Sequence, residues 1–395
     1  MPFSARILVV LFVIVVSDSL ASTAEEPVLL KPTSVNLLLK PLRNEWREWV
    51  GVCHHRWQRI TALSVGQTGE IWVGTSDGRL LSMANDKWVV QAELHGTQIR
   101  SIATVVPETV WLSTNEGLRR LDWEKGSWKL TSFRSYYQGP PAFVSGGYLP
   151  GEDAVRWWGH VDRVYIPPRE NTYAPFAISN EHGLFSFGGY GTVWHHYLPH
   201  YWGANSEWMD LRKLIPHRRP TSMVEDADSH LWIGTQWDGI VRLNGHARVY
   251  HERSPKQNDK DGTEFTFIDS KEVGVEFDEV VSLARGVDRG IWAVLALKDQ
   301  REILARFDGQ AWSTMRLPGK GDRANCITEV EPGTILVGLQ ENQRRSIVSI
   351  DWESQKIEPV KGPQYDVFEI LSLPDGRVFA ASPYGLFEKN TANQN

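Results

Sequence analysis

The residues best suited to chemistry are rings and imidazoles gathered between positions 136 and 219. The members that combine an apolar face with a polar tip or a large ring are Trp157, Trp158, His160, Tyr190, Trp194, His195, His196, His200, Tyr201 and Trp202. Such side chains stack on the apolar faces of sugars or aromatic ligands, and their tips form hydrogen bonds. We therefore predict that they bind a small molecule or an oligosaccharide. The alternative is that the same rings pack on one another as a plug.

The histidines of this stretch also invite a metal hypothesis. Neutral imidazoles at His195, His196 and His200 could ligate zinc or iron. No carboxylate lies between them, however, and Pro199 argues against a regular helix that would align them. We predict no metal site and no cofactor.

Recognisable catalytic motifs are few. The sequence contains no P-loop and no H-E-x-x-H. Asp153, Glu170, Glu181 and Asp210 could form an acid–base pair, but a sequence does not fix the separation that such a pair needs. Binding is therefore favoured over catalysis. Two alternatives stay open: a carbohydrate-active or lyase-type enzyme, and a scaffold for protein contacts.

A repeated unit must position these residues, and its clearest copy is Ser222 to Leu243, SMVEDADSHLWIGTQWDGIVRL. The alternation around Trp232 predicts a half-buried strand, and Asp238-Gly239 predicts a tight turn before the next strand. Gly234 carries no Cβ, so a neighbouring segment can approach it closely. A meander of this kind cannot bury its faces alone and must stack on copies of itself.

The sequence holds seven copies of the unit. They span Ile60–Met83, Ile99–Leu121, Phe176–Phe187, Ser222–Leu243, Val280–Phe307, Cys326–Ile350 and Val367–Lys389. One equivalent position carries Trp72, Trp111, Trp232 and Trp292, then Leu336 and Phe379. The 39 residues from Trp72 to Trp111 suit a four-stranded blade. A turn followed by tryptophan, at Trp88, Trp128 and Trp312, predicts the fourth strand and the outer edge of a blade.

The pattern D-x-x-x-x-(I/L)-W-(I/V/L)-G-T, followed after two or three residues by glycine and clearest in Glu225 to Leu243, resembles the two-component regulator propeller repeat. That repeat builds the seven-bladed sensor propellers of hybrid histidine kinases and their stand-alone relatives. The resemblance covers Ile60 to Lys389 and implies an all-β fold: a seven-bladed β-propeller of four-stranded antiparallel blades. The unpaired strand at Glu45 to Val52 is expected to close the ring by pairing with the last unit.

The N-terminus has the features of a secretory signal over residues 1–24. Arg6 precedes an apolar run from Ile7 to Val16, and small residues allow cleavage near Ala21 or Ala24. The run is too short to span a bilayer, although a retained anchor is the alternative. We predict an exported protein, periplasmic or extracellular, with an irregular surface leader at 25–44. Residues 45–395 are expected to form one propeller, with the aromatic-rich insertion at 136–219.

The composition limits the classes of partner that the protein is expected to bind. Lys+Arg total 42 against Asp+Glu 48, and no basic stripe appears, so nucleic acid is not expected. No further segment could cross a membrane. Cys53 and Cys326 fall in different repeats and are expected to be free thiols, with a disulfide as the alternative. The sequence thus predicts an exported ligand-binding or sensing propeller, with carbohydrate as the favoured ligand and a protein partner on the propeller face as a further expectation.

Overall fold

A computed structural model describes most of the chain from residue 28 to residue 390. The segments that it leaves undescribed in this span are 43–45, 54–57, 67, 107, 134, 138–154, 158–159, 167–174, 180–182, 188–193, 197–219, 238, 244–264, 318–322, 341–345, 361 and 364. The predicted acids Asp153, Glu170, Glu181 and Asp210 lie outside the described residues.

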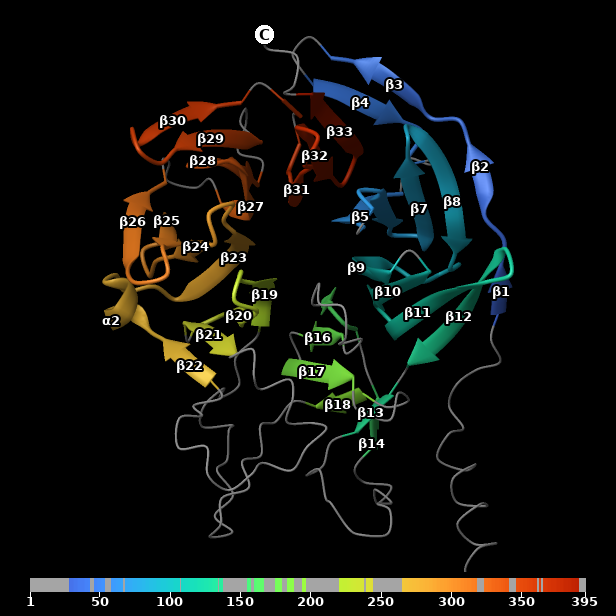
Figure 1. The fold of residues 1–395 in the computed structure, drawn as a ribbon, viewed down its shortest axis with the longest axis horizontal. Helices are drawn as coiled ribbons and strands as arrows, with labels where there is room; N and C mark the ends of the chain where they lie inside the picture. Colours follow the sequence, from blue (N-terminus) through green and yellow to red (C-terminus); the bar gives the residue numbers. More distant parts are fainter. Residues whose placement is uncertain are drawn as a thin grey trace, which may run out of the picture.

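The described strands form seven sheets arranged around a central axis (Figure 1). The first two sheets are built on β5 (Ile60–Val65), β6 (Ile71–Thr75), β7 (Arg79–Ala84) and β8 (Lys87–Glu93), and on β9 (Ile99–Val106), β10 (Thr109–Thr114), β11 (Gly117–Glu124) and β12 (Ser127–Phe133). Each sheet is an antiparallel meander whose first strand lies nearest the axis and whose later strands lie progressively further out.

The third sheet departs from this regularity. It contains six strands in the order β14 (Val155–Trp157), β13 (Ser135–Tyr137), β18 (Trp194–His196), β17 (Gly183–Phe187), β16 (Phe176–Ser179) and β15 (Arg163–Tyr165). β13 pairs with β18 in parallel, unlike the other strand pairs of this sheet. The stretch at 136–219 is therefore more than a loop insertion, because its described parts supply most of this sheet.

The remaining sheets return to the regular pattern. The fourth sheet contains β19 (Pro220–Glu225), β20 (Leu231–Thr235), β21 (Ile240–Leu243) and β22 (Phe265–Ile268), and the fifth contains β23 (Glu279–Arg285), β24 (Ile291–Ala296), β25 (Glu302–Phe307) and β26 (Trp312–Arg316). The sixth contains β27 (Ala324–Glu331), β28 (Thr334–Leu339), β29 (Ile347–Asp351) and β30 (Lys356–Pro359). The seventh contains β31 (Glu369–Ser372), β32 (Arg377–Ser382) and β33 (Gly385–Asn390), and β4 (Trp46–Val50) completes it.

The predicted fold class is confirmed as an all-β propeller of four-stranded antiparallel blades. Six of the seven sheets contain the regular four-stranded antiparallel blade, and the third is the irregular member of the ring. In the described part of the chain the single helix is α2 (Ser270–Val273), which lies against β26.

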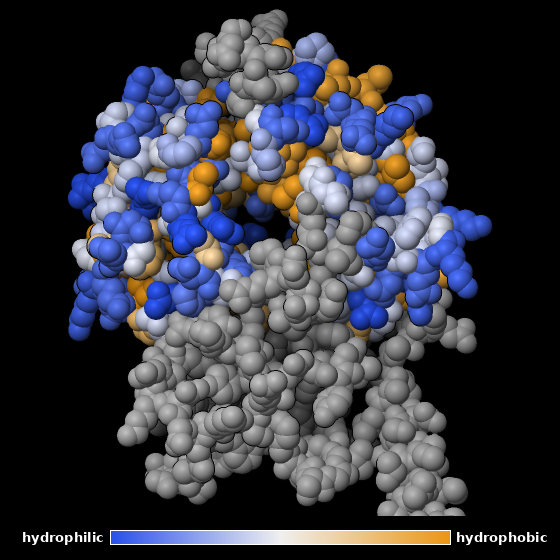
Figure 2. Space-filling view, in the orientation of Figure 1, coloured by the Kyte–Doolittle hydropathy of each residue, from blue (hydrophilic) through white to orange (hydrophobic). Residues whose placement is uncertain are grey.

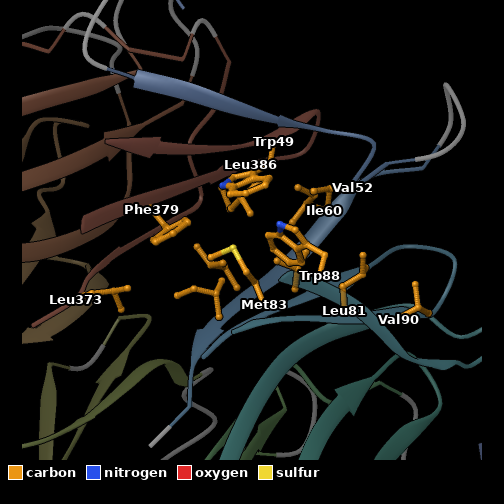
Figure 3. Packing of buried hydrophobic residues seen from close by; sticks show 14 residues of the cluster. Trp49, Val52, Ile60, Leu81, Met83, Trp88, Val90, Leu373, Phe379 and Leu386 are labelled. Carbon is orange, nitrogen blue, oxygen red and sulfur yellow. The ribbon is translucent and has the colours of Figure 1, made fainter. Parts of the chain in front are cut away.

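Burial explains why the sheets form a ring. The buried apolar residues divide into seven clusters, and each cluster lies between two sheets that are consecutive in the chain or between the last sheet and the first. Figure 3 shows the cluster between the last and first sheets, where Phe379 and Leu386 face Ile60 and Met83. A blade therefore has no core of its own, and stability comes from stacking each sheet on its two neighbours.

The repeat residues are placed as the sequence predicts. Trp72, Trp111, Trp232 and Trp292 are all at most 3 % exposed, and Leu336 and Phe379 are buried at the same position. A Cβ at Gly234 would lie 2.6 Å from Val280 on the next sheet, and one at Gly74 would lie 2.5 Å from Ile99. Glycine is needed at this step because the innermost strand of the neighbouring blade occupies the space.

We predict that replacing any one of these four tryptophans with alanine lowers the free energy of unfolding by about 3–5 kcal/mol, because each ring fills space between two blades. Denaturant titration of Trp232→Ala measures the loss. Trp237→Ala is the matched control, since Trp237 lies in the turn between β20 and β21 and is 57 % exposed. Equal losses in both variants would contradict the structural role.

The ring is closed by its N-terminal strand, as expected. β4 pairs antiparallel with β33, with Trp49 opposite Leu386 and Trp46 opposite Lys389. Trp49 packs into the cluster between the last and first sheets, whereas Trp46 packs into the cluster between the sixth and seventh. The buried carboxylate of Glu388 accepts hydrogen bonds from Trp49 Nε1 (2.8 Å) and Arg47 Nη2 (2.7 Å).

The expectation of an irregular leader at 25–44 is wrong for its described part. β1 (Val28–Leu30), β2 (Thr33–Val35) and β3 (Leu38–Pro41) pair with β12, β8 and β4 on three successive sheets (Figure 1). Each strand sets an aliphatic residue opposite a tryptophan: Leu30 opposite Trp128, Val35 opposite Trp88, and Leu39 opposite Trp49. β8 and β12 are therefore not edge strands, since this segment covers them.

We predict that β4, more than the strands before it, holds the ring together. A chain that starts at residue 44 should unfold at only a slightly lower temperature than one that starts at residue 25. A chain that starts at residue 53 lacks both Trp46 and Trp49, and its free energy of unfolding should fall by more than about 5 kcal/mol. Thermal unfolding by circular dichroism compares the three, and the idea fails if the two shorter chains are equally stable.

Candidate functional site

One face of the ring gathers two kinds of segment: the starts of the innermost strands and the turns between second and third strands. Backbone hydrogen bonds join them, from Ser76 N to Arg59 O (2.9 Å) and from Gln340 N to Arg323 O (2.7 Å). We call this face the mouth face. Because every blade contributes both segments, all seven sheets can present side chains around the same end of the channel.

Charged side chains line the channel at this end, and Figure 2 shows the opening at the centre of the ring. They come from the first two residues of innermost strands or from the residue just before them. Among them are Arg100, Asp162, Arg163, Glu279, Arg323 and Glu369. This ring of charge was not predicted from the sequence.

Arg163 and Glu369 approach each other across the channel. Arg163 begins β15 in the third sheet and Glu369 begins β31 in the seventh, and these two sheets are not neighbours on either side of the ring. Arg163 Nη1 lies 3.8 Å from Glu369 Oε2, and the side chains are 42 % and 28 % exposed. The pair therefore sits in the channel itself, where solvent or a ligand can reach both groups.

The pairs around the mouth differ in how well they are bonded. Arg100 Nη2 donates to Asp162 Oδ1 at 2.6 Å, a charge-assisted hydrogen bond between the second and third sheets. Arg323 Nη2 lies 3.9 Å from Glu279 Oε2, and this separation, like that between Arg163 and Glu369, exceeds hydrogen-bonding distance.

Partial removal from water and a nearby charge both shift the pKa of Glu369, whose side chain is 28 % exposed. Removal from water raises the pKa of the Glu369 carboxyl, and the Arg163 guanidinium offsets only part of this rise. The same surroundings affect Cys326, whose thiol pKa is raised well above its ordinary value by burial first and by the negative charge of Glu369 second. The surroundings of Glu369 thus disfavour its ionised form, a situation that is common at functional sites.

Exposed aromatic rings surround the charged mouth. Among the described residues the exposed large aromatics are Trp123, Trp237, Tyr365 and Tyr384. Trp237 and Tyr384 lie in turns between second and third strands, and Tyr365 precedes β31, so these three belong to the mouth face. The rings of Tyr365 and Tyr384 are 5.1 Å apart, and the Arg59 guanidinium lies 5.8 Å from the Tyr384 ring centre.

The backbone conformation at Trp237 is unusual. Its φ of 79° lies in the left-handed region, which a bulky side chain rarely adopts. The backbone N–H of Trp237 donates to Asp278 O, just before β23 of the next sheet. The backbone of this turn is thus tied to the next sheet, and it carries an exposed indole at the rim.

The structure divides the predicted ligand-binding residues. His160 lies beside the mouth, half-buried, with Nε2 4.0 Å from Asp162 Oδ1 and its carbonyl accepting from Ser179 Oγ. Trp157 belongs to β14, and Trp194, His195 and His196 form β18, in the outer half of the third sheet rather than on its channel strand. The remaining members, Trp158, Tyr190, His200, Tyr201 and Trp202, lie outside the described residues.

Other sequence expectations can be compared with the described residues. Cys53 is half-buried and Cys326 buried, and both are free thiols. Burial raises the pKa of Cys53 to about 11. Within the described ranges, no three His, Cys, Asp or Glu side chains are grouped to hold a metal ion, and no helix is long and apolar enough to span a membrane.

Comparison with known proteins identifies the fold. No protein-family model and no curated protein matches the chain. Among solved structures, it resembles the extracellular domain of the hybrid two-component system protein BT3049 from B. thetaiotaomicron, with a TM-score of 0.52 and 13 % identity over 84 % of this chain. The match covers 40 % of that longer domain.

Two further structures are similar over nearly their whole length. They are the Cps50 (Swd1) β-propeller domain of Myceliophteria thermophila, with a TM-score of 0.56, 12 % identity and coverage of 85 % and 97 %, and YCF48 bound to D1 peptide, with a TM-score of 0.55, 10 % identity and coverage of 90 % and 100 %. At these identities the comparisons establish a shared propeller fold.

We predict that Glu369 serves function rather than stability. Its pKa is raised in the folded chain, so its ionisation destabilises the fold as the pH rises through that pKa. Glu369→Gln should leave the free energy of unfolding at pH 7 unchanged or higher. Glu388→Gln, the matched control, removes the charge that Arg47 and Trp49 bond and should cost about 1–3 kcal/mol. Denaturant titrations at pH 7 test this, and a large loss for Glu369→Gln would contradict it.

Proposed function

We propose that this protein is a ligand-binding or sensing propeller that takes a small polar molecule at the channel mouth. The observation that carries the proposal is the pair formed by Arg163 and Glu369, which face each other across the channel from non-adjacent blades. Ligands of closed propellers can contact several blades at once at such a position. A charge pair that is half-exposed and adds little stability is better explained by binding than by folding.

The rim supports the same site. Tyr365 and Tyr384 form an adjoining pair of exposed rings near the start of β31, and Trp237 stands in the turn of another blade. Flat rings with polar tips beside charged groups suit a polar ligand that carries an apolar face. Similarity to an extracellular sensor domain is compatible with sensing, although it rests on the fold alone.

Export and sugar binding remain parts of the proposal that rest on sequence. The secretory features of residues 1–24 favour action outside the cytoplasm. An oligosaccharide is favoured by the aromatic side chains of 136–219, many of which lie outside the described residues.

A protein partner docked on the mouth face is the second candidate. Exposed aromatics are enriched where proteins meet, and three of the four exposed large aromatics described here belong to this face. YCF48, which shares the fold, has been solved with a bound peptide. A partner of this kind would cover the rim, whereas a small ligand would enter the channel beside Arg163 and Glu369.

Screening by thermal shift, with sugars, organic acids, amines and amino acids, tests the proposal. A compound that binds should lose at least about tenfold in affinity in Arg163→Gln and Tyr384→Ala, which is about 1.4 kcal/mol. Trp123→Ala is the matched control, because Trp123 is an exposed ring at the far end of β11 from the mouth face. If both mouth variants bind the compound as tightly as the unaltered protein does, the ligand lies elsewhere and the proposed site is refuted.

A further inference from the structure

Four charges at the mouth have unused hydrogen-bonding capacity. Within the described chain, the side chains of Arg163, Glu369, Glu279 and Arg323 make no hydrogen bond to protein atoms; each only faces its opposite charge at 3.8 or 3.9 Å. Charge-assisted hydrogen bonds between such groups are normally about 2.7–2.9 Å long. The two guanidinium groups therefore keep free N–H donors, and the two carboxylates keep free acceptor oxygens.

The order of these charges around the ring is balanced. Arg163 belongs to the third sheet, Glu279 to the fifth, Arg323 precedes the first strand of the sixth, and Glu369 belongs to the seventh. Arg100 and Asp162 already bond each other and add no net charge. These four described residues are thus two cations and two anions, so as a set they favour neither a simple anion nor a simple cation.

We propose that the mouth binds a dipolar ion, a small molecule that carries both a carboxylate and a protonated amine, as an α-amino acid or a dipeptide does. This inference rests on the proposed function and specifies its ligand class. The ligand carboxylate bonds the Arg163 guanidinium, whose planar fork matches two carboxylate oxygens. Its ammonium group donates to Glu369, which stands directly opposite.

Singly charged ligands satisfy this site less well. A carboxylate alone would occupy Arg163 and leave Glu369 facing a negative group in a partly dehydrated channel. An amine alone would bond Glu369 and face the Arg163 cation. A neutral sugar could form hydrogen bonds but would separate the two charges without replacing either. The raised pKa of Glu369 agrees with a carboxylate that lacks a sufficient cationic partner in the free protein.

Matched probes test the inference on the full chain without its first 24 residues. Isothermal titration uses the twenty standard α-amino acids and diglycine, together with the N-acetylated and methyl-ester forms of the best binder, and maltose as a neutral sugar. We expect the dipolar form to bind at least about tenfold more tightly than either blocked form. Arg163→Gln should remove the advantage over the methyl ester, and Glu369→Gln the advantage over the N-acetylated form.

The outcomes separate this inference from the proposed function. If maltose or a blocked form binds best and Arg163→Gln weakens it, the mouth is a binding site but the dipolar class is wrong. If no amino acid or dipeptide binds, the inference is overturned, and the broader screen then decides the proposed function. Thermal unfolding of Arg163→Gln and Glu369→Gln is measured alongside, so that lost binding is not mistaken for lost folding.

Discussion

The antiparallel pairing of β4 with β33 is the interaction on which the rest of the structure depends. It completes the seventh sheet, and through Trp46 and Trp49 it supplies buried rings to the clusters on both sides of that sheet. Without it, the first and seventh sheets would present open apolar faces, and the ring could open. The position of Glu369 opposite Arg163 exists only while the ring is closed, so the candidate site inherits its geometry from this one strand pair.

The regular blades could be predicted because their signals are local. Trp232 and its equivalents occupy one position of a repeated local pattern, and Gly234 marks where Val280 of the next blade approaches. The strands at 28–41 were missed because each is short, and their apolar residues gain meaning only opposite Trp128, Trp88 and Trp49. In the third sheet, the repeat copy at Phe176–Phe187 corresponds to β16 and β17. The other strands of this sheet were not predicted, because the parallel pairing of β13 with β18 joins segments far apart in the sequence and leaves no repeat spacing.

The candidate site could be predicted less well than the fold. Sequence reasoning favoured the aromatic stretch, and among those of its proposed ligand-binding residues that the structure describes, His160 is the one that lies beside the channel mouth. Arg163 and Glu369 went unnoticed because single charges in separate repeats form no motif, and only ring closure brings them together. A usable signal did exist: once the repeats are aligned, the first positions of the innermost strands can be searched for charged residues in place of the usual small or apolar ones.

The same strand pair has a consequence for how the chain acquires its fold. Trp49 and Glu388 are separated by 339 positions along the sequence, yet their side chains bond directly. A ribosome must therefore make nearly the whole chain before this contact can form, and until then the tryptophans of β4 have no place to pack. Contacts between such distant residues form slowly because a long loop must close first. Closure of the ring by β4 is thus expected to be the last step of folding. The chain whose ring is still open is the species most prone to aggregation.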